Sequence, residues 1–133
     1  MKKFTDVELY WASVHTPNSM SNKYQVNLAN LSPERIQWFE DNGLEVRTKE
    51  NQPEMGTFYT AKSNYPILVL DEDGDVTEDD VGNGSRADIL FTIFEGKNKF
   101  GPYKGLSIKK IKLNEHVRYD KDGVEDEAVD EVL

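Results

Sequence analysis

Apolar and polar residues alternate along two segments near the start of the chain. In residues 4–14, Val7, Leu9 and Trp11 fall on one face of an extended chain, and polar side chains fall on the other. Residues 24–28 repeat this alternation after a turn-rich stretch of Pro, Asn and Ser residues. A period of two is typical of a strand with one buried face. The pattern therefore predicts two strands that pair as a hairpin with a long, flexible connection.

Residues 32–42 carry the signals of a helix. Ser32 is a favourable N-cap, a proline follows it at the first helical position, and a glycine marks the stop. Ile36 and Phe39 form a narrow apolar stripe, and Trp38 is predicted to point away from Ile36. We therefore expect one short helix that covers an end of a sheet.

Short strand patterns occupy much of the chain after this helix, with glycine-rich turns between several of them. The predicted strands are residues 44–48, 57–61, 67–70, 87–94 and 106–117. In the last of these, Leu106 and Ile108 share a face, as do Ile111 and Leu113. The odd step between the two pairs predicts a bulge or a sharp coil there. Many short strands with a single helix indicate a small β-barrel or sandwich.

The formal charge of −9 is concentrated in two segments. Residues 71–80 carry seven acids and no base, and residues 120–133 carry seven acids and one lysine. The other residues carry a net charge of +4, so the body of the protein is mildly basic. In this chain of 133 residues we expect one folded domain over residues 1–119 and a disordered acidic tail over residues 120–133.

Several classes of protein do not fit this composition. The chain has no cysteine, which excludes disulfides and thiolate chemistry. Its start lacks an apolar run and no segment approaches membrane-spanning length, so we expect neither a signal peptide nor a membrane partner. His15 and His116 are the only histidines, and they suggest no nucleophile–base arrangement. We therefore expect a protein that is not an enzyme and uses no cofactor.

Two polar loops resemble ligand sites without meeting their requirements. Residues 71–75 alternate acids as a calcium loop does, but the glycine stands at the fourth position instead of the sixth. A turn between strands explains this segment better, and no metal site is predicted. The segment Gly82-Asn-Gly-Ser85 lacks the lysine and the following helix of a phosphate loop. It is either a turn or a place where backbone amides approach a phosphate beside Arg86.

Aromatic and basic residues are concentrated in residues 94–104. This run holds three aromatic residues and three lysines, and residues 96–112 contain six lysines and no acid. The run is either a lysine-rich hairpin kept soluble by its charge, or a surface on which bases stack while lysines neutralise phosphates. The aromatic residues expected to be exposed on strands or turns are Tyr10, Tyr59, Tyr65, Phe94, Phe100 and Tyr103.

The acidic tail ends on an apolar pair. It is either a solubilising end or a short peptide that docks its apolar tip in a partner's basic-rimmed pocket. The residues that would make such a contact are Asp126, Glu127, Asp130, Glu131, Val132 and Leu133.

Four features follow one another in a specific order along the chain. They are a strand ending in Tyr24-Gln-Val-Asn-Leu28, a helix directly after it, Val81-Gly-Asn-Gly-Ser-Arg86 leading into a strand, and Gly105-Leu-Ser-Ile-Lys-Lys-Ile-Lys-Leu113 before an acidic tail. Each motif is short, but the ordered set spans most of the chain. This set resembles the replication single-stranded DNA-binding proteins of short-tailed bacteriophages.

The resemblance implies an OB-fold, a five-stranded barrel with its helix between the second and third strands. It implies a protein that coats single-stranded DNA during DNA replication and recombination in the cytoplasm of an infected bacterial host. It also implies an acidic tail that contacts the polymerase and the helicase–primase, and copies that form a homodimer through the tail. The residues that would then lie at a DNA-contacting edge are Lys97, Lys99, Phe100 and Tyr103.

Together these patterns predict a sequence-independent single-stranded DNA-binding protein. The predicted stacking residues are Tyr59, Phe94, Phe100 and Tyr103, together with Trp11 if its face of the strand is open. The predicted phosphate contacts are Lys3, Lys23, Arg86, Lys97, Lys99 and Lys104. We expect the acidic tail to compete with DNA for this basic surface. The alternatives are an acidic interaction protein (a DNA mimic or a host-enzyme inhibitor) and a small nuclease with a carboxylate-bound metal.

Overall fold

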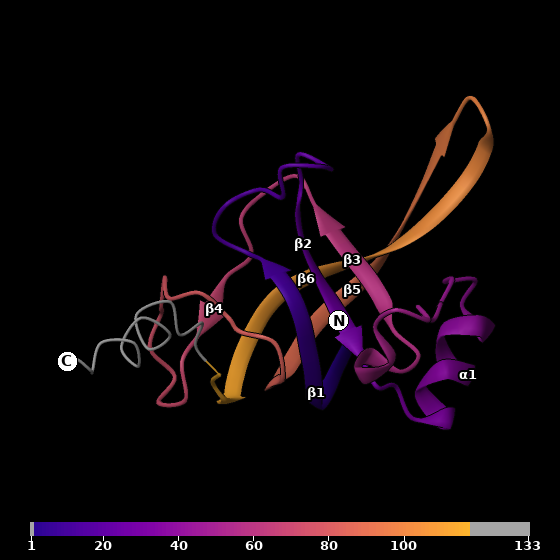
Figure 1. Ribbon diagram of the computed structural model, residues 1–133. Helices are drawn as coiled ribbons and strands as arrows, with labels where there is room; N and C mark the ends of the chain where they lie inside the picture. Colours follow the sequence, from indigo (N-terminus) through magenta and orange to yellow (C-terminus); the bar gives the residue numbers. More distant parts are fainter. Residues whose placement is uncertain (1, 118–133) are drawn as a thin grey trace.

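Six strands form one curled sheet in the order β3-β2-β1-β5-β6-β4 (Figure 1). The computed structural model describes residues 2–117, so the predicted tail lies outside the described residues. The strands are β1 (Lys2–Ser13), β2 (Tyr24–Ala29), β3 (Tyr59–Ser63), β4 (Val69–Leu70), β5 (Ser85–Asn98) and β6 (Gly101–Glu115). Neighbours are antiparallel, except that β4 runs parallel to β6. This strand arrangement, with the helix after β2, confirms the mainly-β, OB-like fold. The sheet has one strand more than the expected five, and the shortest of the six is the two-residue edge strand β4.

The sheet curls until its edge strand β3 lies beside β6. The hydroxyl of Tyr59 on β3 accepts a hydrogen bond from the backbone N–H of Leu106 on β6, with 3.2 Å between oxygen and nitrogen. Within residues 2–117 no backbone ladder joins these two strands, so the sheet curls without closing into a continuous barrel. Side-chain contacts hold this seam instead.

The helix α1 (Pro33–Asp41) covers one end of the curled sheet (Figure 1). Phe39 is fully buried, and Trp38 is half-buried against Phe4 and Phe91, with ring centroids 5.2 Å and 5.6 Å away. Trp38, which lies outside the predicted stripe of Ile36 and Phe39, therefore also packs against the core. The apolar contact is wider than the helical stripe indicates, because aromatic rings reach the helix from both β1 and β5.

A single turn of 3-10 helix, η1 (Pro53–Met55), lies between α1 and β3. Its Met55 is buried with Ala29 and Phe58 in a small second cluster. Neither η1 nor α1 has the length and apolar character needed to cross a membrane, and these are the helices of residues 2–117.

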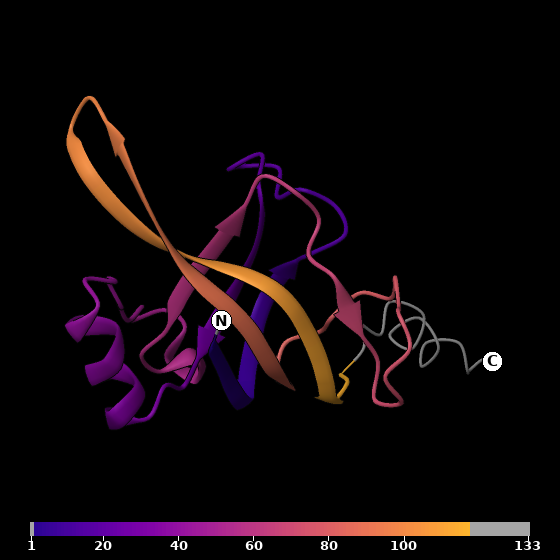
Figure 2. The ribbon, with the colours of Figure 1, turned by 180° about the vertical axis from the view of Figure 1, so that it is seen from behind.

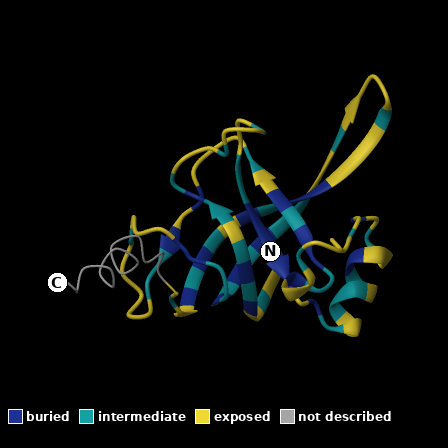
Figure 3. Ribbon diagram, viewed as in Figure 1, coloured by how far each residue is buried: buried dark blue, intermediate teal, exposed yellow. Residues whose placement is uncertain are grey.

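The hairpin of β5 and β6 is longer than predicted. Both strands run past the barrel as a two-stranded arm, seen in orange in Figures 1 and 2, and its outer part is mostly exposed (Figure 3). The predicted bulge is confirmed: Leu90 pairs with Lys110 and Phe91 with Ile108, which leaves Lys109 as the extra residue. The sequence of the arm shows no alternation of apolar and polar residues, because its outer side chains do not pack against a core. Its glycines and charged residues therefore do not predict a strand.

One predicted strand is absent from the described structure. Residues 44–48 form no strand, and Arg47 makes a single antiparallel bridge with Phe58. Leu44 is buried at the start of the segment, whereas the charged residues Glu45 and Arg47 after it are exposed. The segment is therefore an irregular connection between α1 and η1.

Candidate nucleic-acid interface

Three adjoining hollows lie along the outer side of β2 and β3. The first hollow contains Trp11, the second contains Lys23 and Phe94, and the third contains Lys104. Neighbouring hollows share lining residues: the first and second share Lys62, the first and third share Arg47 and Thr60, and the second and third share Tyr103. The hollows therefore form one continuous surface, called the groove below. The lining residues with aromatic rings, positive charges or amide groups that matter here are Trp11, Lys23, Arg47, Lys49, Gln52, Lys62, Tyr65, Phe94, Tyr103 and Lys104.

Positive charge dominates the groove. Its lining contains five bases and a single acid, Glu45. On β3 the alternation explains how charge reaches this face: Ala61 is buried in the core, whereas its neighbour Lys62 is exposed. A concave surface lined by one sign of charge attracts a polyanion and favours its binding at low salt.

Trp11 lies in the groove because β1 breaks its alternation. Val7 and Leu9 are buried as predicted, and strict alternation would place Trp11 beside them. Instead its backbone has φ +51°, and the pairing of β1 with β2 shifts register between Tyr10 and Ser13. The indole is consequently 44% exposed, and it lines the groove beside Arg47.

Phe94 and Tyr103 form a fixed aromatic pair at the base of the arm. Phe94 is paired in register with Gly105, and Tyr103 with Gly96. A Cβ added to Gly96 would lie 2.5 Å from the Tyr103 ring, and one added to Gly105 would lie 2.4 Å from the Phe94 ring. Each ring therefore lies directly on a glycine, and the two rings meet edge to face with centroids 6.2 Å apart. This packing holds both rings at the groove.

The expectation that Tyr59 is exposed is wrong. Its side chain is only 9% exposed, and its ring stacks on Phe39 with centroids 4.9 Å apart. Burial raises the pKa of the Tyr59 hydroxyl above its ordinary value. Because β3 alternates, Tyr59 shares the inward face with Ala61, and its role is to hold the seam between β3 and β6.

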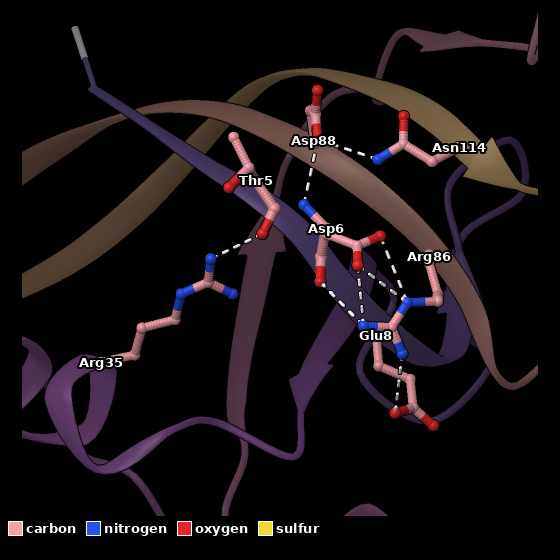
Figure 4. Close-up of polar contacts among 7 residues, drawn as sticks. All are labelled: Thr5, Asp6, Glu8, Arg35, Arg86, Asp88 and Asn114. Carbon is pink, nitrogen blue, oxygen red and sulfur yellow. Dashed lines mark hydrogen bonds and ion pairs between the residues drawn. The ribbon is translucent and has the colours of Figure 1, made fainter.

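Arg86 is held in an ion pair outside the groove (Figure 4). Its guanidinium donates to both carboxylate oxygens of Asp6, with an ion-pair distance of 2.9 Å, and lies 3.8 Å from Glu8. The hydrogen bond from Arg86 holds the pKa of Asp6 below its usual range. The charge of Arg86 is thus already paired on the strands, and the structure does not bring it to the other predicted phosphate contacts.

Four further predicted residues lie away from the groove. Lys3 lines a separate hollow with Lys110 and Lys112 on the outer side of β1, β5 and β6. The other three are exposed at the apex of the arm: Lys97, Lys99 and Phe100. The structure therefore brings together five of the predicted residues in the groove with their side chains accessible: Trp11, Lys23, Phe94, Tyr103 and Lys104.

Sequence reasoning missed four of the aromatic and basic residues of the groove. Lys62 was detectable, because it alternates with buried residues on a predicted strand. Tyr65 was expected to be exposed, and it is 75% exposed, but its place beside Lys23 depends on the fold. Arg47 lies in residues 44–48, which are predicted as a strand but are irregular in the structure, and Lys49 follows them, so the predicted strand does not give the direction of either side chain.

The acidic segment after β4 is a turn, as its sequence favours. The carboxylate of Asp71 accepts hydrogen bonds from the backbone N–H groups of Asp73 and Asp75, both at 2.9 Å. These bonds lower the pKa of Asp71. Among residues 2–117 no group of three or more His, Cys, Asp or Glu side chains is arranged to hold a metal ion.

Comparison with known proteins gives matches at the level of fold. No family model and no curated protein matches the chain. The single-stranded DNA-binding protein from bacteriophage Enc34, solved in complex with ssDNA, has a TM-score of 0.68 and 12% identity, over 89% of this chain and 88% of that chain. Its C-terminal truncation has a TM-score of 0.65 and 12% identity, over 87% and 86%.

A second phage protein has the same arrangement. The single-stranded DNA-binding protein gp2.5 of bacteriophage T7 has a TM-score of 0.52 and 17% identity, over 99% of this chain and 97% of that chain. The described chain therefore has the fold of bacteriophage single-stranded DNA-binding proteins. At these identities the likeness concerns the fold alone, and a function has to be inferred from the residues of the groove.

Proposed function

We propose that this protein binds single-stranded DNA along the groove without sequence preference and is not an enzyme. The observation that carries the proposal is the presence of accessible aromatic rings among five bases on one surface; the rings are those of Trp11, Tyr65, Phe94 and Tyr103. The fold shared with two phage proteins named as single-stranded DNA-binding proteins, one of them solved with ssDNA, supports it.

The groove offers both kinds of contact that an unpaired strand needs. Every base has a π-face, so stacking on an aromatic ring contributes about 1–3 kcal/mol per base whatever the sequence. Lysine and arginine side chains neutralise phosphates and release counterions, which makes binding weaken as salt rises. No base-edge recognition is required, and the proposed binding is therefore sequence-independent.

The apex of the arm extends the contact to longer strands in this proposal. Lys97, Lys99 and Phe100 are exposed there, and Phe100 is 86% exposed with the Lys99 ammonium 5.2 Å from its ring centroid. Phe100→Ala should weaken the binding of long oligonucleotides and leave short ones that fill only the groove unaffected. An equal loss for both lengths would remove the apex from the interface.

The biological setting proposed is DNA replication and recombination in the cytoplasm of a phage-infected bacterium. The acidic residues 120–133 would compete with DNA for the basic body and contact the polymerase and helicase–primase, and copies would pair as a homodimer through the same segment. The test compares the full chain with a chain that ends at residue 119, at low salt. Removal of the tail should raise affinity for an unstructured oligonucleotide, and unchanged affinity would exclude the competition.

A titration tests the binding itself. Fluorescently labelled oligothymidine is mixed with the full chain, and anisotropy is followed at several salt concentrations, with and without magnesium. We expect affinity that falls with salt, is independent of magnesium, and is accompanied by no cleavage of the oligonucleotide. Cleavage that needs magnesium would favour the nuclease alternative. Absence of binding at any salt would favour the acidic interaction protein, which should bind basic proteins instead.

A further inference from the structure

The backbone of β1 is unfavourable where it carries Trp11. A φ of +51° lies in the left-handed region, which bulky residues rarely occupy. Such conformations persist only where surrounding contacts determine them, and they are concentrated at functional sites. Here the result is specific: without the irregularity the indole would share the buried face of Leu9, and with it the indole reaches the groove.

Asn83 supplies the backbone contact at this point. Within residues 2–117 the pairing of β1 with β5 ends at Leu9, and its pairing with β2 passes from Tyr10 to Ser13, so Trp11 has no ladder partner. The Trp11 N–H donates instead to Oδ1 of Asn83, at 2.7 Å. The amide oxygen of a side chain thus takes the place of a strand neighbour.

Gln52 supplies a second contact at the edge of the ring. The indole Nε1–H of Trp11 donates to Oε1 of Gln52, at 2.7 Å. Gln52 directly precedes η1, so the acceptor belongs to a different part of the chain from Asn83. An indole held by its backbone and by one edge has little rotational freedom, and Trp11 remains 44% exposed, which leaves ring surface for stacking.

The loop that carries Asn83 is itself fixed at both sides. The N–H of Gly84 donates to the carbonyl of Leu9 at 2.9 Å, and the N–H of Gly82 donates to the carbonyl of Val117 at 2.6 Å. Gly84 has φ +92°, a conformation that glycine adopts without strain. The glycine-rich segment is therefore a turn, as one interpretation of its sequence holds, and the turn places an amide oxygen against β1.

We infer that Asn83 and Gln52 are positioning residues for single-stranded DNA binding, and that they act by holding Trp11 in its outward, left-handed conformation. This inference rests on the proposed function of the groove. Neither residue needs to touch DNA through a phosphate or a base for this role. Their effect on affinity therefore passes entirely through the indole of Trp11.

A double-mutant cycle on the full chain tests this inference. Affinity for oligothymidine is measured for the wild type, Asn83→Ala, Trp11→Ala and the double variant. Trp11→Ala should weaken binding about 5-fold or more, and Asn83→Ala about 3- to 10-fold, since it loses part of one stacking contact. In the Trp11→Ala background the Asn83 change should have no further effect. Independent, additive losses would overturn the inference, as would wild-type affinity for Asn83→Ala.

A spectroscopic measurement separates positioning from a general loss of structure. The chain is labelled with 5-fluorotryptophan, and the fluorine NMR signal of Trp11 is assigned by Trp11→Phe. In Asn83→Ala the Trp11 signal should shift and change its linewidth, while the signal of half-buried Trp38 stays in place. Asn83→Asp retains an acceptor and should keep the Trp11 signal near its wild-type position. An unmoved Trp11 signal in Asn83→Ala would contradict the inference.

The Gln52 contact has a matched control next to it. Gln52→Ala should move the Trp11 signal and weaken binding, whereas Asn51→Ala, which changes an exposed neighbouring amide, should do neither. Equal effects of the two variants would exclude a specific role for Gln52. If the wild type binds no oligothymidine while the signals move as expected, the positions of the residues are right and the proposed function fails.

Discussion

The ring of Tyr103 lies directly on Gly96, its partner across the arm. A Cβ at position 96 would come within 2.5 Å of Cζ and of the hydroxyl oxygen of this tyrosine. No side chain other than hydrogen leaves the ring where it is, so the glycine determines how the groove presents one of its aromatic faces.

Gly96→Ala should therefore weaken DNA binding without removing any atom of the wild-type interface. The new methyl group displaces the Tyr103 ring from the groove, so Gly96→Ala should lower affinity for oligothymidine, as Tyr103→Ala should. The expected loss of affinity is about 5-fold or more, for one lost stacking contact. Oligothymidine titrations of both variants and of the double variant measure this. If Gly96→Ala still weakens binding in the Tyr103→Ala background, the effect does not pass through the ring.

Lys62 should contribute to the salt dependence of binding. For single strands, each neutralised phosphate contributes about −0.7 to the slope of log affinity against log salt, so Lys62→Ala should make the slope shallower by about that amount. Lys110→Ala is the matched control, because Lys110 lines the separate hollow of β1, β5 and β6. Equal changes in slope for the two variants would show that general charge, and not the groove, governs binding.

Tyr59 should matter for stability and not for affinity. Tyr59→Phe removes the acceptor of the Leu106 N–H at a buried seam, and an unsatisfied buried donor costs about 1–3 kcal/mol of unfolding free energy. Urea denaturation measures this loss, with Tyr65→Phe as the control because Tyr65 is exposed. A marked loss of oligothymidine affinity in Tyr59→Phe, with unchanged stability, would return this residue to the interface.

The Asp6–Arg86 pair should make stability depend on pH. Hydrogen bonding from Arg86 lowers the pKa of Asp6 from its ordinary value of 3.8, so the folded state binds this proton less readily than the unfolded state. The stabilisation is present above the unfolded pKa and is lost as pH falls through the lower, folded pKa. Arg86→Ala should therefore be less stable than wild type near pH 7, and the difference should shrink in acid. Urea denaturation of both proteins near pH 7 and in acid measures this difference in unfolding free energy. A difference that does not change with pH would contradict the role of the pair.

Local patterns were sufficient to predict the strand cores and the barrel class, because each depends on neighbours in sequence. The burial of Val7 and Leu9 and the bulge at Lys109 both follow from a period of two and its interruption. Trp11 is the instructive exception: the same period predicts its burial, and an acceptor 72 residues away reverses the outcome.

The groove could be predicted only in part, since it depends on distant segments that meet. Arg86 looked available in sequence, but its partner Asp6 lies 80 residues away on β1. Arg47 reaches the groove from residues 44–48, whose pattern predicts a strand although the structure has an irregular segment there. Composition thus predicted the kind of surface, an aromatic and basic one, whereas the curl of the sheet decides which residues compose it.

The most direct test of the account is the change in Trp11 emission when oligothymidine is added to the full chain. We predict quenching that saturates, weakens as salt rises and does not depend on magnesium. We also predict that Trp11→Phe abolishes most of this quenching, because the remaining Trp38 is packed against the core. An emission spectrum that oligothymidine leaves unchanged at low salt, together with no shift of the oligonucleotide in a gel, would contradict the assignment of this groove to single-stranded DNA.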